Sequence, residues 1–238
     1  MSETRILELD DIDAIVEPFD WDFSRSHAAD IEAIWQRETA AKPGMFNGRV
    51  LIQHRGAPEG RVFRCAYSET DYRTFLSWHR LGHPGAPVRN GFGMAALRTA
   101  DGAFLLGEMG AHTANAGKIY FAAGTPDLDD IVKGRVDLAG SVLREMSEET
   151  GLLTSEVEVG NGWTAIFSAV RIAFMRPVSL PLPADEARTL MLERMRQLPD
   201  QELSDIHIVR GPADIDEVRM PIFQQIYLRY AFGAQPPG

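Results

Sequence analysis

The chain has almost no cysteine, no long hydrophobic run and no export signal. Its 238 residues include a single cysteine, Cys65, so no disulfide can form within the chain, and nothing in the composition favours an oxidising compartment. The first residues lack the basic start and apolar core of a signal peptide, and the apolar stretch at residues 165–175 is interrupted by Arg171. We therefore expect a cytoplasmic protein without a membrane span.

The protein is also short of positive charge. Its 24 Lys and Arg residues stand against 34 Asp and Glu residues, for a formal net charge of −10 at pH 7. Binding to a phosphate backbone needs clustered cations, so neither a long nucleic acid nor an anionic membrane is an expected partner. An acidic protein can still bind a small nucleotide through a metal ion. Hydrophobic residues make up 45% of the chain, which is typical of one or two globular domains.

Periodicity and turn residues predict strands and helices that do not alternate strictly. Strands are expected at residues 5–16 (as a strand-turn-strand), 48–54, 61–67, 93–98, 103–107, 118–122, 156–159 and 163–175. Helices are expected at 26–40 with Ser26 as the cap, shortly after a cap at Ser68 or Thr70, and at 137–150, 184–198 and 221–232. This order favours a mixed sheet packed between helices.

Glycine and proline are concentrated at residues 82–89, and the hydrophobic pattern changes after them. Such a stretch is typical of a domain boundary. We therefore predict an N-terminal domain at residues 1–88 and a second domain at residues 89–238.

The predicted helix at 137–150 concentrates negative charge beside an apolar stripe. At about 100° per residue, Glu145, Glu148 and Glu149 fall within one third of its circumference. Arg144 can pair with Glu148 but cannot neutralise all three carboxylates. Oxygen ligands at this density suit Mg²⁺ or Mn²⁺ better than zinc. The alternative is a Glu-rich helix face that is simply exposed to solvent.

The run from Arg144 to Leu152 resembles the second half of the Nudix box, R-E-U-x-E-E-x-G-U, where U is aliphatic. Its positions are matched by Arg144, Glu145, Met146, Glu148, Glu149, Gly151 and Leu152. The resemblance extends over about residues 93–152. It implies an α+β fold: a Nudix-like α/β/α sandwich with a mixed sheet, here preceded by a small α/β N-terminal domain.

The first half of the box departs from the family pattern. The family's first glutamate would fall at Val136, and the nearest acid is Asp137. We hypothesise that Asp137 takes over the role of orienting Arg144. The best candidate for the box glycine, Gly124, lies 20 residues before Arg144 rather than 14, so the intervening loop is longer by six residues.

The resemblance implies a metal-dependent pyrophosphohydrolase acting on a nucleoside diphosphate linked to another group. Glu145 and Glu149 would be direct ligands of Mg²⁺ or Mn²⁺, and Glu148 a ligand or the base that orients water. Arg144 would complete the catalytic set, and the backbone carbonyl of Ala123 or Gly124 would complete the metal shell. The substrate would be a small nucleotide.

Two N-terminal phrases, residues 45–49 and 68–76, are similar to the leading segment of the Nudix branch that cleaves UDP-sugars. This likeness implies a nucleotide sugar as substrate and a lid, substrate-binding or dimerisation role for the first domain. One alternative is a catalytically silent Nudix-fold module that binds a nucleotide or regulates a partner, although its usual mark is a degraded Glu cluster. Another is a Nudix-like isopentenyl diphosphate isomerase, but its cysteine would have to be Cys65, which precedes the predicted boundary.

Overall fold

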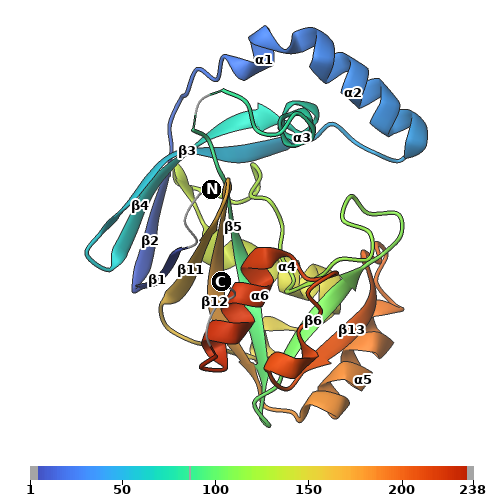
Figure 1. Ribbon diagram of the computed structural model, residues 1–238. Helices are drawn as coiled ribbons and strands as arrows, with labels where there is room; N and C mark the ends of the chain where they lie inside the picture. Colours follow the sequence, from blue (N-terminus) through green and yellow to red (C-terminus); the bar gives the residue numbers. More distant parts are fainter. Residues whose placement is uncertain (1–4, 86, 235–238) are drawn as a thin grey trace. The chain divides into compact units, whose positions relative to one another are not determined.

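The computed structural model describes residues 5–85 and 87–234 (Figure 1). The chain forms two compact units. Unit 1 comprises the residues up to Asp10, Phe92–Gly124 and the residues from Ala139 onward; unit 2 comprises Asp11–Gly91 and Thr125–Leu138. The predicted boundary near residue 88 lies close to the one at Gly91. Two segments lie in the other unit than the predicted domains would place them: the first strand belongs to unit 1, and residues 125–138 belong to unit 2.

Unit 1 is built on an eight-stranded sheet in the order β1-β11-β12-β5-β6-β13, with β10 beside β12 and β7 beside β6 (Figure 1). The strands are β1 (Arg5–Leu9), β5 (Asn90–Thr99), β6 (Phe104–Met109), β7 (Ile119–Tyr120), β10 (Glu158–Val159), β11 (Trp163–Ser168), β12 (Arg171–Leu180) and β13 (Leu203–Val209). Its helices are α4 (Leu138–Thr150), α5 (Ala184–Met195) and α6 (Ile222–Ala231), with short 3₁₀ turns η1 (Thr154–Glu156) and η2 (Pro212–Asp214).

The core of unit 1 joins α6 to the sheet through aromatic rings. Phe104 on β6 lies 5.7 Å from the ring of Phe121 and 5.9 Å from that of Tyr227 on α6. Helix α5 packs against β13 and β6, where Arg188 donates to the carbonyl of Ile206 at 2.7 Å.

Unit 2 has a five-stranded sheet in the order β3-β4-β2-β9-β8. Its strands are β2 (Asp11–Val16), β3 (Arg49–Glu59), β4 (Val62–Asp71), β8 (Ile131–Val132) and β9 (Arg135–Val136), and its helices are α1 (Phe23–Ser26), α2 (Ala28–Ala41) and α3 (Tyr72–Arg80). Strands β2 and β4 run parallel, whereas β3 and β4 run antiparallel, so this sheet is mixed. Trp78 on α3 is buried and meets Trp21 edge-on at 5.8 Å.

The predicted mixed α/β class is confirmed, but several local predictions are wrong. The predicted strand at 163–175 is two strands, β11 and β12, because the chain turns at Ala169 (φ 50°), where no glycine or proline marks a turn. Asp71, not Ser68 or Thr70, caps α3 by accepting from the Thr74 N–H at 2.8 Å. Ser26 ends α1 instead of capping α2.

Three strands were missed: β8, β9 and β13. The first two are two residues long, too short to show any alternation, and they occupy the loop predicted to be longer than usual. No helix in the described part of the chain is long and apolar enough to cross a membrane.

Candidate active site

Helix α4 packs an apolar stripe into the core of unit 1, and its carboxylates lie on the neighbouring face of the helix. Val142 and Met146 are fully buried, as the helical spacing of four residues requires for neighbours on one face. The helix ends where Gly151 adopts φ 72°, a left-handed conformation that glycine accepts without strain. The predicted helix at 137–150 is confirmed to within one residue at its start.

Glu149 is the most unusual carboxylate of the site. Its side chain is buried at 5% exposure, its Oε2 has no hydrogen-bond partner among the described residues, and the Ala123 N–H donates to the carboxylate. Burial raises the pKa of Glu149 well above its usual value, and the neighbouring charges of Glu145 and Glu202 raise it further. A negative charge on Glu149 would therefore need a compensating group that the described residues do not supply at its Oε2.

Glu145 lies against the backbone of Gly124. A β-carbon placed on Gly124 would stand 2.5 Å from Cδ of Glu145 and closer still to Oε1, so any other residue here would displace this carboxylate. Residues 123 and 124, which the sequence predicts as a source of a backbone ligand, thus lie beside both Glu145 and Glu149. The structure brings these predicted site residues together.

Arg144 bridges the other two carboxylates of the helix. Its guanidinium pairs with Glu145 at 2.9 Å and with Glu148, one turn further along, at 2.9 Å. Glu148 is the most exposed of the three box glutamates, with 58% of its side chain accessible. Across residues 5–85 and 87–234, no three His, Cys, Asp or Glu side chains stand gathered as a metal centre. Rotation of the glutamates would be needed for them to share one ion.

Asp137, predicted to orient Arg144, lies in the single position between β9 and α4. Its N–H donates to the carbonyl of Asp130 at 2.8 Å. Its action on Arg144 stays a prediction.

Sequence reasoning missed Glu202, which directly precedes β13. Its charge raises the pKa values of both Glu149 and Tyr120, and its carbonyl accepts from the Gly110 N–H at 2.7 Å. Burial is the main cause of the raised pKa of Tyr120, whose hydroxyl accepts from Asn115 at 3.1 Å. No local motif marks Glu202, because only the pairing of β13 with β6 brings it to this end of the sheet.

A second missed residue, Arg194 on α5, holds the C-terminal end of α4. It donates to the carbonyl of Gly151 at 3.1 Å and pairs with both oxygens of Glu156, at 2.5 and 2.7 Å. The Arg194 pair lowers the pKa of Glu156 to about 2. Gly151 is needed here for a second reason, since a β-carbon on it would lie 2.6 Å from Cβ of Arg194.

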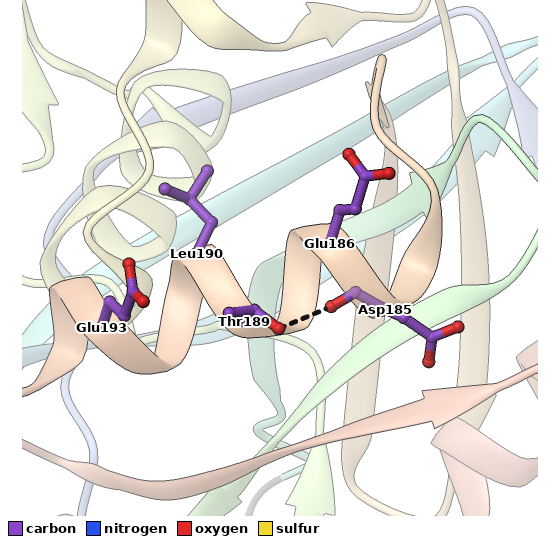
Figure 2. A pocket seen from close by; sticks show the side chains of 5 residues that line it. All are labelled: Asp185, Glu186, Thr189, Leu190 and Glu193. Carbon is purple, nitrogen blue, oxygen red and sulfur yellow. Dashed lines mark hydrogen bonds between the residues drawn. The ribbon is translucent and has the colours of Figure 1, made fainter.

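A shallow surface pocket lies elsewhere in unit 1, on the outer side of α5 (Figure 2). It is lined by Asp185, Glu186, Thr189, Leu190 and Glu193. Thr189 Oγ1 donates to the carbonyl of Asp185 at 2.9 Å, as Figure 2 shows, and the Asp185 carboxylate pairs with Arg210 at 2.9 Å. The pocket includes none of the predicted site residues, and its acids at the start of α5 suit the positive end of a helix.

Comparison with known proteins gives partial structural likenesses only. No protein-family model matches the chain, and no curated protein matches it. Among the solved structures that are similar to parts of it are the following three. The Nudix hydrolase RenU of M. smegmatis is 13% identical, over 50% of this chain and 68% of its own, with a TM-score of 0.33. The MutT protein of Methanosarcina mazei Go1 is 16% identical, over 60% of this chain and 94% of its own, with a TM-score of 0.37.

The pyrophosphohydrolase BsRppH of Bacillus subtilis is 15% identical, over 52% of this chain and 63% of its own, with a TM-score of 0.27. Part of the chain is thus similar to Nudix hydrolases. Because the identities and TM-scores are low, the function proposed below rests on the side chains of α4 and their surroundings.

Proposed function

We propose that this chain is a Nudix-type pyrophosphohydrolase that cleaves the pyrophosphate bond of a nucleoside diphosphate linked to another group, with Mg²⁺ or Mn²⁺ as cofactor. The observation that carries the proposal is the buried carboxylate of Glu149. Its Oε2 has no partner among the described residues, and the charges of Glu145, Glu148 and Glu202 all oppose its ionisation. A buried charge surrounded by like charges is costly unless a cation compensates it.

The residues present fit a hard divalent cation. The donors are carboxylate oxygens together with the backbone at Ala123 and Gly124, the ligand chemistry that Mg²⁺ and Mn²⁺ prefer. When bound, such an ion would neutralise the diphosphate and lower the pKa of a bound water. Phosphoryl transfer needs this charge compensation and good positioning more than covalent help from the protein.

We assign separate roles to the carboxylates. Glu145, seated against Gly124, and Glu149, fixed by the Ala123 N–H, would hold the ion. Glu148 is exposed enough to reach a water molecule, so it would be a ligand or accept the proton of the attacking water. Glu202, outside the motif, is a second candidate for that proton. Arg144 would orient Glu145 and Glu148 by pairing with both.

A nucleotide sugar is our proposed substrate class. The two phrases that resemble the UDP-sugar branch come together at the start of α3. Asn47 Oδ1 accepts from the Arg73 N–H at 2.8 Å, and the Tyr72 N–H donates to the carbonyl of Gly48 at 2.9 Å. In unit 2 these residues therefore build one local structure.

A substrate panel tests the proposal. UDP-sugars, ADP-ribose, NADH, dinucleoside polyphosphates and CoA would be incubated with the full chain in Mg²⁺, in Mn²⁺ and in EDTA, and phosphate-containing products measured. We expect turnover only with a divalent ion, and fastest on a UDP-sugar. Cation binding without turnover of any substrate would instead support the silent nucleotide-binding module.

A further inference from the structure

Two of the three box glutamates lie on the last turn of α4, where a helix is least secure. Glu148 and Glu149 come directly before Thr150, at which the helix ends. The last carbonyls of a helix have no partners within it, so a terminal turn opens more readily than the middle unless a group outside the helix holds it. Reacting groups that must keep fixed positions on such a turn therefore need an external hold.

Arg194 on α5 supplies a hold just after this turn. Its guanidinium donates to the carbonyl of Gly151 at 3.1 Å and to the two oxygens of Glu156 at 2.5 and 2.7 Å. Glu156 in turn accepts from the Leu153 N–H at 2.9 Å. Arg194 thus fixes the chain after α4 at two points, directly at Gly151 and through Glu156 at Leu153. Its positive charge also suits the negative end of the helix.

Helix α5 is a firm support for this arginine, and it belongs to unit 1 together with the last turn of α4. The helix packs against β13 and β6. Its four buried residues are at most 1% exposed: Ala184, Ala187, Met191 and Met195. Helix α5 also comes directly against the end of α4, since a β-carbon on Gly151 would lie 2.6 Å from Cβ of Arg194. The arginine therefore links the end of α4 to a well-packed part of the same unit.

We propose that Arg194 is a positioning residue for pyrophosphate hydrolysis, which fixes the end of α4 and thereby the places of Glu148 and Glu149. This inference rests on the proposed function. The Arg194 side chain is 28% exposed, and a partly exposed ion pair contributes little to overall stability. Residues that orient metal ligands from outside the metal's own shell, in contrast, change metal affinity or activity by about 10- to 100-fold. Loss of Arg194 should therefore reduce activity much more than it reduces Tm.

The first test compares Arg194→Gln with Arg210→Gln, using the substrate and metal found on the panel. Arg194→Gln should lower kcat about tenfold and Tm by no more than about 4 °C, and it should leave KM within about twofold because no substrate contact is removed. Arg210 pairs with Asp185 at the opposite end of α5 at 2.9 Å, so Arg210→Gln is the matched control. Its kcat should stay near that of the wild type. An equal loss of kcat in the two variants would overturn the inference, because any weakening of α5 would then lower activity.

Two further readouts do not depend on turnover. Without substrate, Arg194→Gln should need about tenfold more Mg²⁺ than the wild type for half of the Mg²⁺-induced rise in Tm, because Glu149 is one of the proposed ligands. Amide hydrogen exchange should become faster at residues 148–153 and stay unchanged in the middle of β12. Unchanged exchange at residues 148–153, or an unchanged Mg²⁺ requirement, would overturn the inference.

Failure of this inference is distinguishable from failure of the proposed function. An active wild type matched in kcat by Arg194→Gln refutes only the role of Arg194. A wild type that hydrolyses no substrate on the panel refutes the proposed function and, with it, any positioning of catalytic groups by Arg194.

Discussion

Replacing Gly124 with alanine separates the function of the site from the stability of the fold. A β-carbon at this position would stand 2.5 Å from Cδ of Glu145. Ordinary contacts between carbon atoms begin near about 3.5 Å, so the carboxylate must retreat by roughly 1 Å. The obstructed group is the end of a flexible side chain, and it can move without disturbing the helix.

The expected magnitudes follow from that displacement. A shift of about 1 Å in a group that must be placed for reaction costs about 10²-fold in rate. Gly124 has no left-handed backbone angle, so alanine is tolerated there, and the free energy of unfolding should change by less than about 1 kcal/mol. Gly124→Ala should therefore be well folded and nearly inactive.

The assay pairs kcat in saturating Mg²⁺ with thermal unfolding in EDTA. The matched control is Gly211→Ala, because Gly211 is extended (φ −174°) and a β-carbon there meets nothing within 4 Å. The control should keep both activity and Tm. If Gly124→Ala retained wild-type kcat, Glu145 would not need its place beside Gly124, and the assignment of Glu145 as a ligand would be refuted.

Two further predictions concern charge. Burial and neighbouring carboxylates raise the pKa of Glu149 above its unfolded value, so the ionised group destabilises the fold increasingly as pH rises. Glu149→Gln should thus raise Tm at pH 7 in EDTA. It should also abolish metal-dependent turnover and the Mg²⁺-induced rise in Tm. A variant with a lower Tm and full activity would contradict the role of Glu149. The pKa of Glu156 is lowered to about 2 by Arg194, so its stabilisation is present above its unfolded pKa and is lost as pH falls toward 2. Because both side chains are about 30% exposed, we discount this contribution to about 1 kcal/mol. Between pH 7 and pH 3, the free energy of unfolding of Glu156→Gln, measured by chemical denaturation, should change by about 1 kcal/mol less than that of the wild type. An identical change in the two proteins would show that the pair contributes nothing.

Much of the fold could be read from local patterns. The hairpin of β5 and β6 turns at Gly102, whose φ of 85° is the conformation that its Asp-Gly sequence favours. Helix α4 likewise ends at Gly151, because glycine accepts the left-handed conformation (φ 72°) that ends the helix. The turn at Ala169 and the two-residue strands β8 and β9 carry no such signal, because short or unmarked segments are defined by what they pair with.

The site divides in the same way. The sequence by itself determined that Glu145, Glu148 and Glu149 share one face of a helix and that Arg144 can reach Glu148, because helical periodicity fixes neighbours three and four residues apart. Only the tertiary structure decided that Glu149 is buried, that Glu145 rests on Gly124, and that Glu202 and Arg194 come close to this helix. Those relations join residues far apart in the chain. They depend on strand order and on helix packing, which no local spacing encodes.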